Sequence, residues 1–266
     1  MVRAKKRFGQ HFLNANAIAE RIAGSLTHHG NYRRVLEIGP GTGALTRFLL
    51  PRTDIDLTCV ELDDEAAAHL RAAFPELGDR LRTGDVLRMD LSRIGEGPMA
   101  IIGNFPYNIS TQIVFQVLAH RDRVMEVIGM FQKEVADRLR AAPGSRTYGI
   151  TSILTQAYYN VDQLMVVEPG SFTPPPKVRS AVVRLQRNGT VKLDCDEPRF
   201  FAMVKQAFNQ RRKTLHNALK GFPGLGERMP DRFRKQRAEQ LSVADFVDLV
   251  NACIPGDGLD GSQRTA

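Results

Sequence analysis

The feature that most constrains the fold is a short apolar run that leads directly into a glycine-rich turn. Residues 35–38 read Val-Leu-Glu-Ile, residues 39–43 read Gly-Pro-Gly-Thr-Gly, and a helical stretch follows over 44–50. Glycine permits a positive φ in a tight turn and lets a ligand approach the backbone. This order predicts a buried strand, a ligand-binding turn and a helix, the first unit of a nucleotide-binding α/β sheet.

The alternation of strand and helix continues along the chain. Strands are expected at 33–38, 55–60, 80–83, 99–103 and 126–131, and helices at 14–27, 44–50, 64–73, 111–118, 134–139 and 149–159. Alternation of this kind implies parallel pairing, so the predicted fold class is α/β with a doubly wound, Rossmann-like sheet. Two further strand-like runs, 161–167 and 180–185, have only a proline-rich loop between them. They predict an antiparallel hairpin at the end of the sheet.

The remainder of the chain is predicted to be helical. Helices are expected at 199–208, 213–220, 232–239 and 243–252. We therefore divide the chain into an α/β domain over 1–186, which includes a basic N-terminal arm, and a small all-α domain over 187–254. Residues 255–266 are rich in Gly, Asp and Ser and are expected to be a disordered tail.

The charge is unevenly distributed. The 266 residues hold 37 Lys and Arg against 29 Asp and Glu, a net charge of +8. The excess lies in residues 1–7 and in residues 199–237, and the rest of the chain is mildly acidic. Such a balance favours an anionic partner, although a solvated, salt-bridged helical surface is the alternative. The adjacent cations Arg211, Arg212 and Lys213 are predicted to contact phosphates of a nucleic acid.

Several classes are disfavoured by composition. No stretch approaches ~18 apolar residues, and the charged N-terminus has no apolar run behind it, so neither a transmembrane helix nor a signal peptide is expected. Cys59, Cys195 and Cys253 are too far apart to form a zinc motif or a disulfide framework. We expect a cytoplasmic monomer without a metal.

Two carboxylates follow the next predicted strands. Glu61 lies 22 residues after Gly39 at the end of the second strand, where a carboxylate can accept hydrogen bonds from ribose hydroxyls. Asp85 follows the third strand and is placed to reach a base, although a turn-capping role is the alternative. No Lys-Ser or Lys-Thr pair completes a phosphate-binding loop. A nucleoside-containing cofactor is therefore predicted, with its identity open.

Residues 104–108, Asn-Phe-Pro-Tyr-Asn, follow the fourth predicted strand. Methylation of an exocyclic adenine amine requires acceptors for its N–H groups, and the side-chain oxygen of Asn104 and the carbonyl of Pro106 can provide them. Tyr107 offers a flat face on which a base can stack. The alternative is a proline turn that packs an aromatic residue into the core. The position of the motif favours a methyltransferase over a dehydrogenase with a similar glycine turn.

With these motifs in place, the chain resembles the ribosomal RNA adenine dimethyltransferases of the KsgA/RsmA type over nearly its whole length. The landmarks, in order, are 6–13 (KRFGQHFL), 37–43 (EIGPGTG), 61–63 (ELD), 84–85 (GD), 104–108 (NFPYN), 172–178 (FTPPPKV) and 208–214 (FNQRRKT). The family commonly has Asn where His11 stands and Leu where Phe105 stands.

The resemblance implies the fold of class I methyltransferases, S-adenosylmethionine as the methyl donor, and two adjacent adenosines near the 3′ end of 16S rRNA in the 30S subunit as the substrate, each dimethylated at N6. It implies that the donor is bound by His11, Leu13, Gly39, Gly41, Glu61, Asp85 and Asn104. It also implies that Tyr107 and Phe172 sandwich the target base. Lys177, beside the proline-rich loop, is expected to meet the RNA backbone.

Three alternatives remain open from the sequence. An Erm-like 23S rRNA methyltransferase would use the same chemistry on another RNA. A nicotinamide oxidoreductase would use the same glycine turn. A non-catalytic ribosome-assembly factor would bind RNA only, although the complete donor motif disfavours that as its sole role.

Overall fold

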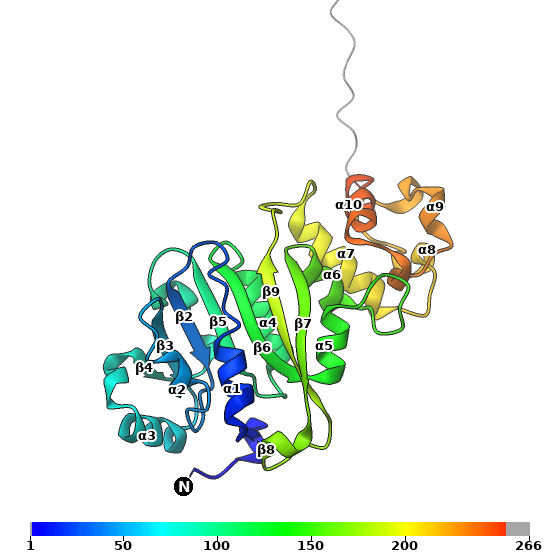
Figure 1. Ribbon diagram of the computed structural model, residues 1–266. Coiled ribbons are helices and arrows are strands. Elements are labelled where there is room, and N and C mark those ends of the chain that lie inside the picture. The colour runs from blue at the N-terminus through cyan, green and yellow to red at the C-terminus, as the bar shows by residue number, and fades with distance from the viewer. Residues whose placement is uncertain (1, 254–266) are drawn as a thin grey trace, which may run out of the picture. The chain divides into compact units, whose positions relative to one another are not determined.

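The computed structural model describes residues 2–253, which form two compact units (Figure 1). The first unit comprises 2–140 and 158–191, and the second comprises 141–157 and 192–253. The expected tail at 255–266, like residue 254, lies outside the described residues.

The first unit is built on a seven-stranded sheet with the order β4-β3-β2-β5-β6-β9-β7. Its strands are β2 (Arg34–Ile38), β3 (Asp56–Glu61), β4 (Leu81–Thr83), β5 (Met99–Asn104), β6 (Val124–Gln132), β7 (Tyr159–Val167) and β9 (Ser180–Arg187). The strands from β4 to β6 are parallel, and β9 runs antiparallel to both β6 and β7. The predicted α/β class and its terminal antiparallel hairpin are confirmed.

The central strands are apolar because both faces of the sheet are covered. The helices of this unit are α1 (Asn16–Ala23), α2 (Thr46–Leu49), α3 (Asp64–Ala73), α4 (Ser110–Ala119) and α5 (Lys133–Leu139). Val35 and Ile102 belong to one buried cluster with Ile22 of α1 and Leu49 of α2. Leu36 is also buried and points to the opposite face, because successive strand residues alternate.

A second, two-stranded sheet joins the N-terminal arm to the proline-rich loop. Strand β1 (Phe12–Leu13) pairs antiparallel with β8 (Phe172–Thr173), so that Leu13 lies opposite Phe172. Neither strand was expected from the sequence, because two-residue strands carry no periodicity. This pairing holds the arm at the carboxyl edge of the parallel strands, where the side-chain oxygen of Thr173 also accepts a hydrogen bond of 2.9 Å from the Asn14 amide.

The second unit is helical, as predicted. It comprises α6 (Ile150–Gln156), α7 (Glu197–Asn209), α8 (Leu215–Ala218), α9 (Asp231–Arg234) and α10 (Val243–Asn251). Phe246 of α10 packs between Phe200 and Phe208 of α7, with ring centroids 6.5 and 6.3 Å apart.

The division between the units differs from the expected boundary at 186–187, because residues 141–157 group with the C-terminal helices. The Tyr148 ring lies 6.2 Å from the Phe208 ring, and the Gly144 amide donates a 2.6 Å hydrogen bond to the Glu239 carbonyl. The α/β sequence pattern is continuous through this segment, so its tertiary partners could not be inferred from local periodicity.

Several predicted helices are too long. The helices expected at 14–27, 44–50 and 213–220 span only Asn16–Ala23, Thr46–Leu49 and Leu215–Ala218. The helix expected at 149–159 ends at Gln156, and Tyr159 begins β7. Tyr159 pairs with Arg187 of β9, and its hydroxyl donates a 2.9 Å hydrogen bond to the Val124 carbonyl. The helix expected at 232–239 ends at Arg234, and a separate 3-10 turn follows at Ala238–Gln240. Among residues 2–253, no helix is both long and apolar enough to span a bilayer.

Candidate active site

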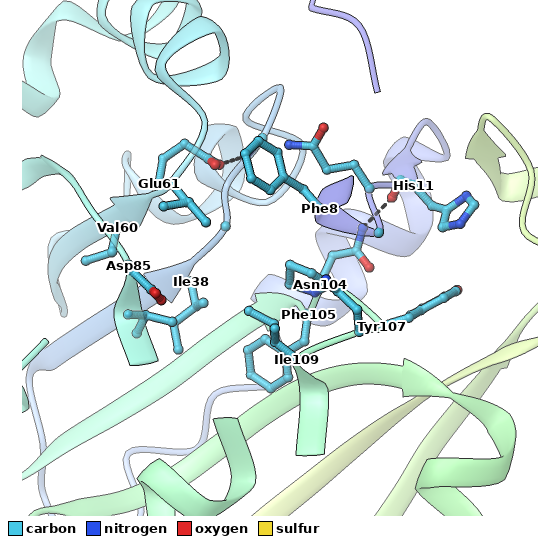
Figure 2. A pocket seen from close by; sticks show the side chains of 18 of the residues that line it. Phe8, His11, Ile38, Val60, Glu61, Asp85, Asn104, Phe105, Tyr107 and Ile109 are labelled. Atoms are coloured by element: carbon cyan, nitrogen blue, oxygen red, sulfur yellow. Dashed lines mark hydrogen bonds between the residues drawn. The ribbon is translucent and has the colours of Figure 1, made fainter. Parts of the chain in front are cut away.

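A cleft opens where the parallel strands β2 to β5 end (Figure 2). It encloses about 760 Å³ of empty space including its open mouth. Eight residues singled out in the sequence line it: His11, Gly39, Gly41, Glu61, Asp85, Asn104, Pro106 and Tyr107. Residues distant in sequence meet here because the carboxyl ends of parallel strands share one edge.

The glycine turn forms the base of the cleft. Gly39 and Gly41 have φ values of 64° and 59°, which favour glycine. A Cβ on Gly41 would lie 2.9 Å from the Phe12 ring, so the turn also allows the N-terminal arm to pack closely. Beneath the turn, buried Glu37 accepts a 2.8 Å hydrogen bond from the Thr46 hydroxyl, and burial raises the pKa of Glu37 to about 7.

Glu61 is fixed by backbone donors. Its two carboxylate oxygens accept 2.9 Å hydrogen bonds from the amides of Gly41 and Asp63. The side chain is only 4% exposed, and burial raises its pKa although these amides oppose the shift. Each oxygen keeps lone-pair capacity for a further donor. The carboxylate can therefore accept hydrogen bonds from ligand hydroxyls.

Asp85 caps a turn and also lines the cleft. One carboxylate oxygen accepts a 3.0 Å hydrogen bond from the Leu87 amide and caps a 3-10 turn at Val86–Arg88. The partly exposed residue also lines the cleft. A capping carboxylate is held rigidly, which suits it to a position in a ligand site.

Asn104, the last residue of β5, is oriented by the arm. Its side-chain amide donates a 2.7 Å hydrogen bond to the His11 carbonyl, which Figure 2 marks with a dashed line. The side-chain oxygen has no hydrogen-bond partner among residues 2–253 and remains an available acceptor.

Phe105 departs from the family pattern but is accommodated by two glycines. Its ring is buried and packs edge-on against Phe131, with ring centroids 5.2 Å apart. A Cβ on Gly103 or Gly129 would lie 2.8 or 2.4 Å from the Phe105 ring. The absence of a side chain at these positions leaves room for the larger aromatic residue below the cleft.

Pro106 and Tyr107 form the rim next to Asn104. The Pro106 carbonyl accepts a 3.1 Å hydrogen bond from the Ile109 amide, which fixes its direction and leaves a second lone pair. The Tyr107 hydroxyl is 2.5 Å from the buried Ser180 hydroxyl, and the His11 ring lies 5.2 Å from the Tyr107 ring. The second departure, His11, is thus held beside Tyr107, and its Nδ1 lies 2.8 Å from the Pro174 carbonyl oxygen.

The N-terminal arm closes one side of the cleft and is held by ion pairs. Lys5 bonds to Asp63 and lies 3.2 Å from Glu65, and Gln10 donates a 3.3 Å hydrogen bond to Asp63. Burial would raise the pKa of Asp63, but the bonds from Lys5 and Gln10 outweigh it and lower that pKa. Phe8 and Gln10 both line the cleft. Lys5 is therefore engaged within the protein.

Two predicted ligand residues lie outside this cleft. Leu13 and Phe172 face each other across β1 and β8, and Phe172 is only 2% exposed. Leu13 instead lines a smaller adjoining cavity with Gly39 and Asn104. The ring that lies beside Tyr107 is His11, not Phe172.

The predicted RNA-binding cations differ in their availability. Lys177, Arg212 and Lys213 are exposed and have no ion-pair partner among residues 2–253. Arg211 donates a 2.9 Å hydrogen bond to Glu239 and a 2.6 Å hydrogen bond to the Arg146 carbonyl. Arg211 is therefore a structural link within the second unit, and Arg212 and Lys213 are the two exposed cations of the predicted trio.

The sequence reasoning missed the apolar walls of the cleft. They include Phe8, Ile38, Val60, Leu62, Val86 and Ile109. Ile38 and Val60 directly precede Gly39 and Glu61 at strand ends, a position that could have indicated them. Among the described residues, no group of three or more His, Cys, Asp or Glu side chains is arranged to hold a metal ion.

Comparison with known proteins identifies close relatives of this chain. A family model described as ribosomal RNA adenine dimethylase matches residues 1–254. Ribosomal RNA small subunit methyltransferase A of Cytophaga hutchinsonii is 52% identical over 250 residues, which cover 94% of this chain and 97% of that protein. The protein of the same name from Parabacteroides distasonis is 50% identical over 253 residues, 94% of each chain.

Solved structures share the fold. A dimethyladenosine transferase from Plasmodium falciparum superposes with a TM-score of 0.72 at 25% identity, covering 90% of this chain and 96% of that chain. The 23S rRNA methyltransferase ErmE superposes with a TM-score of 0.65 at 24% identity, covering 90% of this chain and 99% of that chain.

Proposed function

Because the chain belongs to the ribosomal RNA adenine dimethylase family, we propose that it dimethylates N6 of two adjacent adenosines near the 3′ end of 16S rRNA. It is an S-adenosylmethionine-dependent methyltransferase. The reported relatives at about half identity are named for the small subunit, whereas the similarity to ErmE extends to the fold alone. These relatives favour neither a 23S rRNA substrate nor a nicotinamide oxidoreductase activity.

The cleft fits the donor. Glu61 presents two backbone-anchored oxygens with spare lone pairs, as ribose hydroxyls require, and Gly39 and Gly41 present backbone without side chains. Asp85 offers a carboxylate for an adenine amine. S-adenosylmethionine, when bound, supplies a methyl group on a positively charged sulfur. The apolar walls restrict water around the reacting atoms.

The available oxygen of Asn104 carries the proposal. We assign its Oδ1 and the carbonyl of Pro106 as acceptors for the two N–H groups of the target amine. An adenine amine is a poor nucleophile because its lone pair is delocalised into the ring, and two fixed acceptors favour the pyramidal nitrogen that attacks. No strong base is required, because the nitrogen becomes acidic once it has formed the new bond.

Tyr107 is assigned as the stacking platform for the target base. A base buried in folded RNA must leave its stack to reach the cleft. The Ser180 hydroxyl fixes the Tyr107 side chain from one end, so its ring is pre-oriented. Phe172 can join this stack only if β8 separates from β1, because the residue is buried in the β1–β8 pair.

We also propose the particle on which the enzyme acts, its cellular compartment and its oligomeric state. The exposed cations Lys177, Arg212 and Lys213 suit contacts to the rRNA backbone of a 30S particle or its precursor. All three cysteines are free, which suits a reducing cytoplasm. The enzyme is proposed to act as a monomer.

Substitution of Asn104 tests the site. Asn104→Ala should reduce methyl transfer to unmethylated 30S particles at least 100-fold, because it removes an acceptor of the target amine. The melting temperature should stay within a few degrees of wild type. Asn104→Asp keeps an accepting oxygen but loses the N–H group that bonds to the His11 carbonyl. It should therefore retain more activity than Asn104→Ala but bind S-adenosylmethionine more weakly than the wild type does. Wild-type transfer by Asn104→Ala would refute the site.

A further inference from the structure

A second charged surface adjoins the cleft on the segment between β4 and β5. Residues 80–93 hold four arginines and two aspartates, whereas residues 8–186 as a whole hold 19 basic and 19 acidic residues. An open groove on this segment is lined by Arg82, Asp85, Arg88, Met89, Asp90 and Arg93. Asp85 also lines the cleft, so the two hollows share a wall.

The groove is built from a short repeat, Asp-x-x-Arg, at 85–88 and again at 90–93. Asp85 and Asp90 each cap a 3-10 turn by accepting a hydrogen bond from the backbone amide two residues later, at 3.0 and 2.9 Å. Each turn carries its arginine outward, with the side chains of Arg88 and Arg93 89% and 82% exposed. Two capped turns thus present two guanidinium groups on one surface.

These guanidinium groups are only weakly engaged. The Arg88 Nε lies 3.6 Å from the Asp85 carboxylate, and the Arg93 Nε lies 3.9 Å from the Asp90 carboxylate. Exposed ion pairs of this geometry contribute little, so an anion can compete for both arginines. Arg82 differs, because it donates a 3.0 Å hydrogen bond to the Arg93 carbonyl and so supports the second turn.

The groove is hydrogen-bonded to α4, the helix that follows the loop carrying Tyr107. The Gln116 side chain, on α4, donates a 2.8 Å hydrogen bond to the Leu87 carbonyl in the first turn. Helix α4 begins at Ser110, directly after the loop that follows Asn104 and carries Tyr107. The arginines therefore have a defined position relative to the site of methylation.

We propose that Arg88 and Arg93 bind successive phosphates of the rRNA backbone beside the methylation site. A planar guanidinium matches a phosphate in shape and charge, and an open groove admits a polymer strand. The contact positions the RNA without reading its sequence. This inference rests on the proposed function, because it requires that the anionic partner be the RNA substrate.

The test is the double variant Arg88→Gln/Arg93→Gln, assayed on unmethylated 30S particles. At about 150 mM salt we expect the KM for the particles to rise about tenfold, with kcat unchanged. The slope of log binding constant against log salt concentration should fall by about 1.5, since each phosphate contact contributes roughly 0.7–0.9. The affinity for S-adenosylmethionine and the melting temperature should not change.

Arg33→Gln is the matched control. Arg33 is exposed, lies 3.7 Å from Asp56 and donates a 3.0 Å hydrogen bond to the Thr53 carbonyl. It precedes β2 and so lies at the opposite end of the strands from the cleft. It should leave the KM and the salt slope unchanged. Wild-type values in the double variant, or an equal effect of Arg33→Gln, would overturn the proposal.

Particle binding is measured separately from methyl transfer, which separates two possible failures. If the wild type binds the particles but transfers no methyl group, the proposed function fails. If the wild type binds and transfers while the double variant binds with the wild-type salt slope, only the groove assignment fails. The charge-reversed variant Arg88→Glu/Arg93→Glu should weaken binding further than the glutamine variant.

Discussion

At the scale of single residues, several side chains in the site have more than one role. Asn104 holds the arm through its amide and leaves its oxygen available. Asp85 caps a turn and lines the cleft. Such double use keeps the functional atoms rigid, because each is anchored by a bond the fold already requires. Geometry of this kind favours catalysis by positioning.

The contact between the Tyr107 and Ser180 hydroxyls can be tested separately from the stacking role of the Tyr107 ring. Tyr107→Ala should reduce kcat/KM for the RNA about 10- to 100-fold, because it removes the stacking ring. Tyr107→Phe and Ser180→Ala each remove only the 2.5 Å hydroxyl contact, so each should cost about fivefold.

The double variant Tyr107→Phe/Ser180→Ala supplies the control. Because both changes delete the same bond, the double variant should be no worse than either single variant. The kcat/KM on 30S particles is measured for the three single variants and the double variant. Effects that multiply would show that Ser180 does not act through Tyr107.

At the scale of elements, the N-terminal arm is held at Phe12–Leu13 by the β1–β8 pairing and near its start by electrostatic contacts. Lys5 contacts Asp63 and Glu65, and those bonds raise the pKa of Lys5. Gly9, Gln10 and Phe12 of the arm line the cleft. A loss of the contacts that hold the arm should therefore also weaken binding of S-adenosylmethionine.

Lys5→Ala is therefore expected to weaken S-adenosylmethionine binding several-fold at low salt. Salt screens exposed charges, so wild type and variant should converge in affinity near 0.5 M NaCl. Calorimetric titration at two salt concentrations tests this. Equal affinity and equal salt dependence of the two proteins would show that the ion pairs do not hold the arm over the donor.

Strand ends and the glycine turn are local signals, so the sequence was sufficient to predict the parallel sheet, its hairpin and seven of the eight cleft residues. The eighth, His11, was implied only by the family resemblance. The sequence could not place Leu13 and Phe172, which are removed from the cleft by the pairing of β1 with β8. It also could not place residues 141–157, whose partners in α7 lie far along the chain. Long-range pairing of short segments leaves no periodic pattern.

At the scale of the whole molecule, the basic charge that first indicated an anionic partner is divided among several roles. Lys5 and Arg211 are engaged in ion pairs, whereas Arg212 and Lys213 are exposed. Net charge therefore overstates the number of cations available to RNA.

This division predicts different effects for neighbouring substitutions. Arg212→Gln/Lys213→Gln should reduce the affinity for 30S particles and the salt slope, with donor affinity and melting temperature unchanged. Arg211→Gln should instead lower the melting temperature by several degrees, because it breaks the bonds to Glu239 and to the Arg146 carbonyl. Binding titrations and thermal melts of both variants test these roles. A stable Arg211→Gln variant with weakened RNA binding would show that Arg211 contacts RNA and is not a structural residue.

The central claim is that this enzyme methylates adenosines of the small-subunit rRNA. The most direct measurement is transfer of tritiated methyl groups from S-adenosylmethionine to unmethylated 30S and 50S particles, with the modified bases mapped. The predicted result is close to four methyl groups per 30S particle, on N6 of two adjacent adenosines near the 3′ end of 16S rRNA, and none on 50S particles. Methylation of 50S particles, or of any other position in the 30S particle, would contradict it.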